Sequence, residues 1–117
     1  FNRYGEPILR LLSNGRLVTF SGQSIGFLDG ENLYTYKGKH VGWFELGIVR
    51  DHRGAVVGFG LKPTDSTMPF LPYRQWIPYR GYVGYEPYRP YKGYAPYKPF
   101  KLYSWSDFDP VTLFEQV

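Results

Sequence analysis

The chain has 117 residues, the size of one small domain, with 14 Lys and Arg against 10 Asp and Glu, a net charge of +4, and 24 Phe, Trp and Tyr. It contains no Cys, which excludes a disulfide framework, a thiolate metal site and a Cys nucleophile. No apolar run approaches the roughly 18 residues of a membrane-spanning helix.

The first 62 residues repeat with a period of 16. Glycines recur in two phases: Gly22, Gly38 and Gly54, then Gly26, Gly42 and Gly58. One period before Gly26, Arg10 stands in place of the glycine. Apolar residues flank this second phase, and they are the predicted core of four units: Leu9, Leu11, Ile25, Phe27, Val41, Trp43, Val57 and Phe59.

A second track of residues repeats in the same region but is shifted against the first. It comprises Leu17/Phe20, Leu33/Tyr36 and Val49/His52, and one period earlier Phe1/Tyr4. The first 4 residues therefore supply the strand that the fourth unit lacks, and the N-terminal strand closes a ring. Closure hides sheet edges that would otherwise template aggregation.

Local chemistry in this region favours strands. Apolar residues alternate with Gly or polar residues at period 2, and no segment has a convincing period of 3.6. Asn14-Gly15 and Asp29-Gly30 are typical hairpin turns, because these residues tolerate positive φ. We predict an all-β domain, a small pseudo-four-fold ring of β-hairpins. Its core is small enough that we expect further burial against the tail or neighbouring chains.

Residues 38–59 resemble a known family. The stretch GKHVGWFELGIVRDHRGAVVGF is similar to the bacterial β-flower family, also called the four-fold β-flower. Ser104-Trp105-Ser106, ahead of Phe108 and Phe114, resembles its C-terminal Ser-Trp-Ser element. The resemblance implies hairpin petals around a pseudo-four-fold axis and a Pro/basic repetitive tail. It implies no settled activity, so no catalytic residue is carried over.

After a predicted linker at 63–68, residues 69–103 repeat with a period of three. Each unit has the form [Pro/Gly]-aromatic-[Lys/Arg], whereas the family's usual tail is rich in aliphatic residues. The aromatic residues are Phe70, Tyr73, Trp76, Tyr79, Tyr82, Tyr85, Tyr88, Tyr91, Tyr94, Tyr97, Phe100 and Tyr103. The basic residues are Arg74, Arg80, Arg89, Lys92, Lys98 and Lys101.

A strict period of three predicts a polyproline-II rod. Only a helix with three residues per turn keeps all twelve aromatics on one edge, and such a rod would be roughly 100 Å long at ~3.1 Å per residue. A disordered Pro-rich tail is the competing interpretation. An ordered rod has no internal hydrogen bonds and must lie against its own β-domain, against equivalent rods of other chains, or against both.

Charge divides along the same boundaries. Formal charge is +2 in residues 1–68, +5 in residues 69–103 and −3 in residues 104–117. We therefore expect the acidic C-terminal segment, with Asp107, Asp109 and Glu115, to neutralise part of the basic edge, either within one chain or between chains.

Two histidines are the candidates for chemistry. His40 or His52 beside Glu45 or Asp51 would suggest a metal or acid/base site, but two His without a third ligand are a weak signal. His52 shares the repeat phase of Phe20 and Tyr36, which favours packing, and Trp43 is expected in the core rather than in a ligand-stacking platform. No nucleophile or phosphate-binding motif is present. We predict no catalytic, cofactor-binding or metal-binding residue, and no enzyme.

The rod is the predicted functional surface. The leading hypothesis is a structural protein that assembles with itself, as an oligomer or filament, through the Tyr/Pro-rich rod. The alternative is a binding module for a polyanion, either nucleic acid or acidic polysaccharide. Stacking on sugar rings and docking as a polyproline ligand are further possibilities. Extracellular fibre and cytoplasmic assembly both stay open as locations.

Overall fold

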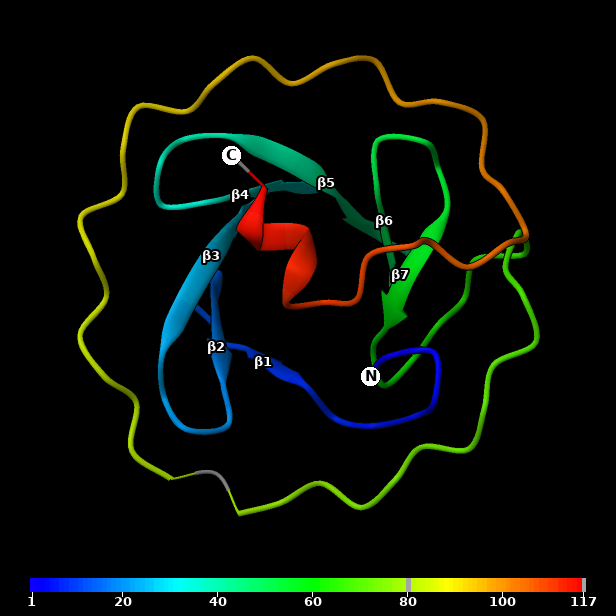
Figure 1. The fold of residues 1–117 in the computed structure, drawn as a ribbon, viewed down its shortest axis with the longest axis horizontal. Helices are drawn as coiled ribbons and strands as arrows, with labels where there is room; N and C mark the ends of the chain where they lie inside the picture. The colour runs from blue at the N-terminus through cyan, green and yellow to red at the C-terminus, as the bar shows by residue number, and fades with distance from the viewer. Residues whose placement is uncertain (80, 117) are drawn as a thin grey trace.

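The computed structural model describes residues 1–79 and 81–116, and these form seven short strands and one short 3-10 helix. Consecutive strands pair antiparallel, so the sheet order follows the chain, and the sheet curls into a half-barrel (Figure 1). The elements are β1 (Leu9–Leu11), β2 (Arg16–Thr19), β3 (Ser24–Asp29), β4 (Asn32–Tyr34), β5 (His40–Glu45), β6 (Ile48–Arg50), β7 (Val56–Phe59) and η1 (Thr112–Glu115).

Four outer turns with the same hydrogen bonds divide the ring (residues 1–62) into petals. In each turn a side-chain oxygen accepts the N–H of the residue four positions later, at 2.9 to 3.3 Å. The accepting residues are Asn2, Thr19, Thr35 and Asp51. Side chains that bond their own backbone favour turns, which fixes the petal tips locally. The predicted four-unit arrangement thus has a structural signature at each tip.

In the first petal the repeat is shifted by one residue from its predicted position. Because Asn2 corresponds to Thr19, Gly5 corresponds to Gly22, a spacing of 17 rather than 16. Tyr4 is therefore out of phase with Phe20, and it is 67% exposed. The single extra residue between the first two tips displaced the repeat.

Phe1 closes the ring against β7. Its carbonyl accepts the N–H of Phe59 at 2.9 Å, its nitrogen donates to the Phe59 carbonyl at 2.8 Å, and the two rings stack at 5.4 Å. The predicted closing strand of residues 1–4 is thus one pair of residues, because residues 2–6 already form the first tip.

The core lies inside the ring and beneath it. Leu33, Val41 and Val57 pack with Leu113 of η1 in one buried cluster, and a second cluster forms around Ile48, Val56 and Phe59. Of the predicted core positions, five are buried and Leu9 and Ile25 are half-buried. The expectation for Leu11 was wrong, since it is 44% exposed. β1 pairs only with β2, and Leu11 lies on the wall of a cavity there.

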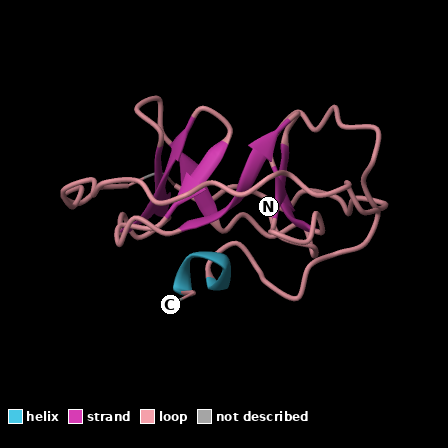
Figure 2. Ribbon diagram, turned by 90° about the horizontal axis from the view of Figure 1, so that it is seen from above, coloured by secondary structure: helices cyan, strands magenta, loops and turns pink. Residues whose placement is uncertain are grey.

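Residues 69–103, here called the belt, contain no assigned strand or helix in their described part and run around the outside of the ring (Figures 1 and 2). A straight rod of roughly 100 Å is therefore the wrong shape, because the whole molecule measures 35 × 35 × 22 Å. The segment bends because it is fastened to each petal in turn.

The C-terminal segment returns under the ring. Ser104 and Ser106 flank Val56 of β7 through backbone hydrogen bonds of 3.0 and 2.8 Å. η1 then packs below the strands (Figure 2), where Leu113 is fully buried.

Candidate functional site: the belt and its aromatic rim

The belt is fastened to the four petals by backbone hydrogen bonds. Belt N–H groups donate to the glycine carbonyls of the petal tips at 2.8, 2.8, 2.8 and 3.1 Å. The donors lie nine residues apart, which is three units of the period-three repeat, so the same edge of the belt faces every petal. The pairs are Gln75 to Gly5, Gly84 to Gly22, Gly93 to Gly38 and Leu102 to Gly54.

The close contact between the belt backbone and the petal tips requires glycine at these petal positions. All four have φ between +79° and +97°, a region that favours glycine. A Cβ at Gly38 would lie 2.5 Å from the Tyr91 carbonyl oxygen, and a Cβ at Gly22 would overlap that of Tyr82. The sequence showed the glycine phase but not its purpose, which is to let two backbones meet.

A signal for the fastening points is present in the sequence and was missed. Seven of the twelve units place Pro before the aromatic, and the other five have Gln75, Gly81, Gly84, Gly93 or Leu102 there. Proline has no N–H to donate, so only these five units can bond to a petal through this position. Four of the five, spaced nine residues apart, are the docking points.

All twelve belt aromatics point away from the ring and form the aromatic rim. Eleven are 81 to 99% exposed, and Tyr103 is 67% exposed. Soluble proteins rarely expose contiguous apolar surface on this scale, and where they do it usually marks an interaction site. The predicted aromatic edge is thus present as a surface around the equator of the molecule, where Figure 1 shows the belt.

The basic residues of the belt face the ring. Lys92 pairs with Asp29, and Lys98 with Glu31 at 2.6 Å and Glu45 at 3.1 Å. Arg80 lies outside the described residues. Within the chain, the described residues do not show the expected pairing of the belt with the acidic C-terminal segment, and pairing between chains stays a prediction. Instead Asp107 lies 3.9 Å from Arg53, Asp109 accepts the N–H groups that begin η1, and no ion pair of Glu115 is found in the described part.

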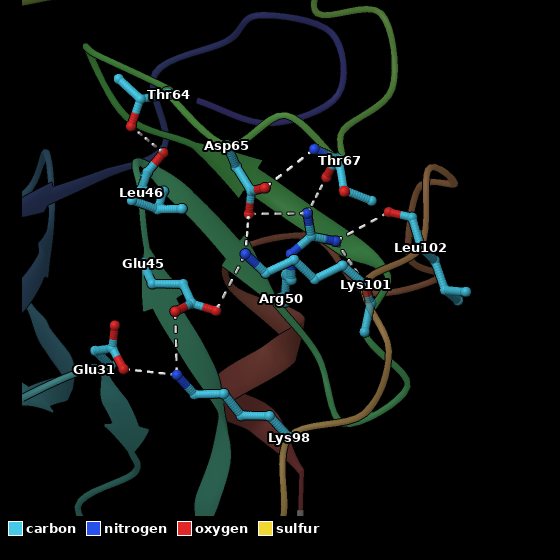
Figure 3. A network of polar contacts seen from close by, with 11 residues as sticks. Glu31, Glu45, Leu46, Arg50, Thr64, Asp65, Thr67, Lys98, Lys101 and Leu102 are labelled. Carbon is cyan, nitrogen blue, oxygen red and sulfur yellow. Dashed lines mark hydrogen bonds and ion pairs between the residues drawn. The ribbon is translucent and has the colours of Figure 1, made fainter.

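Arg50 joins the segment that precedes the belt to the C-terminal end of the belt (Figure 3). Its guanidinium donates to the carbonyls of Gly54 at 2.7 Å, Leu102 at 3.0 Å and Thr67, and to Asp65 at 3.3 Å. Lys101 also contacts Asp65, at 2.9 Å. Burial alone raises the pKa of Asp65, but hydrogen bonds from Lys101, the Thr67 backbone and Arg50 lower it below its usual value. Asp65, in the predicted linker, is 2% exposed.

A second polar contact holds the middle of the belt. Glu86 accepts hydrogen bonds of 2.7 Å from Tyr36 and from Arg89, and Arg89 also donates to the Asn14 carbonyl and lies 5.0 Å from the Phe27 ring centroid. Burial and the bond to Glu86 raise the pKa of Tyr36 to about 12. The one acidic residue of the belt is therefore an internal acceptor.

The two histidines contact each other rather than a carboxylate. His40 Nδ1 lies 2.9 Å from His52 Nε2, and His40 Nε2 lies 3.0 Å from Asn32 Oδ1. Burial and the neighbouring His52 lower the pKa of His40 to about 4. Trp43 is buried and packs against His40, with the ring centroids 4.9 Å apart. His40 is buried in this pair, whereas His52 stacks on it from an exposed position.

The carboxylates proposed beside the histidines have other partners. Asp51 caps its petal tip and accepts the Ser106 hydroxyl, while Glu45 faces Lys98 and Lys101. Among residues 1–79 and 81–116 we find no group of three His, Asp or Glu side chains that could hold a metal ion.

None of the helical structure in the described part of the chain is long and apolar enough to cross a membrane. Comparison with curated proteins gave no match, and comparison with solved structures gave none. A family model described as "4-fold beta flower protein" matches residues 1–114, nearly the whole chain. With its four petal tips and closed ring, the chain belongs to the 4-fold β-flower protein family.

Proposed function

We propose that the protein is a non-enzymatic assembly subunit that associates with further copies of itself through the aromatic rim. The observation that carries this proposal is the outward exposure of all twelve belt aromatics. Tyrosine rings supply apolar area and a hydroxyl donor at low cost in side-chain entropy, which suits them to protein interfaces.

The charge distribution supports a second copy as the partner. Four of the six basic residues of the belt, the lysines and Arg89, are paired with acidic groups, whereas Arg74 donates to the Leu61 carbonyl. These pairs reduce the like-charge repulsion between two approaching rims. Four similar petals offer the same kind of surface in four directions, so contacts through the rim would extend into oligomers or larger arrays.

The rim also depends on a conformation that we assign to the belt. A quarter of a circle 35 Å across is about 27 Å, and nine residues of polyproline II at ~3.1 Å each span about 28 Å. The proposed conformation thus matches the distance from petal to petal and presents three aromatics in each quarter. It replaces the predicted straight rod by a curved one.

Sedimentation velocity over a range of protein concentrations tests self-association. We expect the wild type to form concentration-dependent oligomers and the quadruple variant with Tyr85, Tyr88, Tyr91 and Tyr94 changed to Ser to form smaller oligomers at the same concentration, because eight exposed belt aromatics remain. Because these side chains are 82 to 99% exposed, the melting temperature should change little. The matched control changes the same four residues to Phe, which keeps the apolar area and should keep the oligomers. A monodisperse wild-type monomer at high concentration would refute the proposal.

Binding of a polyanion stays an alternative prediction. It needs free basic side chains beside the aromatics, whereas the described belt lysines and Arg89 already have acidic partners, and Arg74 donates to the Leu61 carbonyl. Polyanion binding would weaken steeply with added salt. Self-association through neutral rings should persist at the same salt concentrations, which separates the two functions.

A further inference from the structure

An apolar cavity of about 370 Å³ opens inside the ring. Its walls come from all four units and from η1, including Leu12, Leu17, Leu28, Phe44 and Phe114. This volume falls within the roughly 300–1,000 Å³ that is typical of small-molecule sites. The belt function proposed above does not use this cavity.

Two departures from the 16-residue repeat meet at this cavity. Gly60 stands where the other three units have Leu12, Leu28 and Phe44, so one large side chain is missing from the wall. Arg10 stands where the other three units have Gly26, Gly42 and Gly58, so one charged side chain has been added. The repeat is thus broken twice, once by removing volume and once by adding charge.

Arg10 is the only charged side chain among the described residues that line the cavity. Its Nη1 is buried without a hydrogen-bond partner in the described part of the chain, and no ion pair of Arg10 is found there. A buried donor without a partner costs free energy that a suitable acceptor would recover. Among residues 1–79 and 81–116, no carboxylate lines the cavity to compete for the guanidinium.

We propose that the cavity binds an anionic amphiphile, a medium-chain carboxylate, with its head group on Arg10 and its alkyl chain among the leucines and phenylalanines. A carboxylate is the acceptor that matches the planar fork of guanidinium N–H donors. The apolar walls favour an alkyl chain for the rest of the molecule because they offer no other polar side chain.

Isothermal titration calorimetry on the intact chain tests the site with dodecanoate as the probe and dodecanol as the uncharged control. We expect dodecanoate to bind one molecule per chain, at least tenfold tighter than dodecanol. Arg10→Leu should weaken dodecanoate binding at least tenfold and leave dodecanol binding unchanged. Arg53→Leu is the matched control, because the Arg53 side chain is 75% exposed, and it should change neither. Equal affinity for the two probes, or no effect of Arg10→Leu, would overturn the proposal.

A second variant tests the location independently of Arg10. Gly60→Leu restores the residue type of the other units, and its Cβ would meet only ordinary contacts, 3.5 Å from Phe44 Cζ and 3.8 Å from the Gly47 carbonyl. Because the new side chain takes up part of the cavity, we expect it to weaken binding of both probes at least tenfold while the protein stays folded by circular dichroism. Undiminished binding in Gly60→Leu, or several molecules bound per chain, would place the probe outside the cavity and refute the cavity site.

Discussion

Gly38 and Gly30 separate two reasons for having a glycine. Both have positive φ, +85° and +62°, but a Cβ at Gly38 would lie 2.5 Å from the Tyr91 carbonyl, whereas a Cβ at Gly30 would have nothing within 4 Å. Alanine at either position incurs the cost of a left-handed backbone, roughly 1–2 kcal/mol. Only alanine at Gly38 must also displace the belt.

We predict that Gly38→Ala lowers the free energy of unfolding by about 2 kcal/mol more than Gly30→Ala does. Urea denaturation followed by circular dichroism measures the difference. Limited chymotrypsin digestion should show faster cleavage at the belt aromatics in Gly38→Ala. Equal losses in the two variants would mean that the belt does not depend on this contact.

The residue scale also shows where prediction from sequence stops. The position of Leu11 was predicted from its repeat phase, but exposure depends on what packs beside β1, which the repeat does not encode. His52 shares a phase with Phe20 and Tyr36, yet its contact with His40 depends on two neighbouring petals. Repeat phase identifies equivalent positions, and the exceptions arise where the environments of equivalent positions differ.

At the scale of elements, a cluster of charged side chains holds the end of the belt against the segment that precedes the belt. Arg50 on β6 and Asp65 before the belt are 3% and 2% exposed, and Lys101 near the end of the belt completes the cluster. Removing one partner of a buried pair leaves the other charge uncompensated, which typically costs about 3–5 kcal/mol.

We therefore predict that Asp65→Asn lowers the free energy of unfolding by about 3 kcal/mol, because Arg50 and Lys101 lose their shared carboxylate. Asp107→Asn is the matched control, since Asp107 and its partner Arg53 have side chains 97% and 75% exposed, and it should change stability by less than about 0.5 kcal/mol. Guanidinium chloride denaturation of both variants checks this. Similar small effects in both would show that the Arg50 cluster does not hold the belt.

The belt also shows what a periodic sequence determines about an element. The period of three predicted which side chains share an edge, and the structure places those aromatics together on the outside. It did not predict curvature, because polyproline II has no internal hydrogen bonds and takes its path from external contacts. The four docking contacts are backbone to backbone, so their trace in the sequence is limited to units that lack proline.

At the scale of the whole molecule, the histidine pair makes stability depend on pH. The pKa of His40 is about 4 in the folded protein and lies near the ordinary histidine value of 6.5 once the chain is unfolded. Between these values the unfolded chain binds a proton that the folded chain excludes, so stability falls as pH decreases from about 6.5 to 4, by at most ~3 kcal/mol.

We predict a lower melting temperature at about pH 5 than at about pH 6.5, and a smaller difference in His40→Gln. Both pH values lie above the range in which the carboxylates that hold the belt begin to protonate. Differential scanning calorimetry of both proteins at the two pH values measures the effect. The same pH dependence in wild type and variant would show that His40 does not control it.

The family and the all-β class were predicted from the sequence, and the match over residues 1–114 confirms them. The ring could be predicted because a 16-residue repeat with Gly turns encodes local hairpins. The path of the belt could not be predicted from the sequence. It depends on two different periods, 16 residues in the ring and nine in the belt, that meet at the same four points in space.

The belt docks on the petals through its backbone. The fold therefore does not depend on which side chains stand in the rim. The rim side chains take no part in the four docking bonds, whose donors are the main-chain N–H groups of Gln75, Gly84, Gly93 and Leu102. Substitutions at the outward positions therefore leave the fastening intact, provided that proline stays away from the donors. The side chains at the twelve outward positions can therefore change during evolution while the way the chain folds does not.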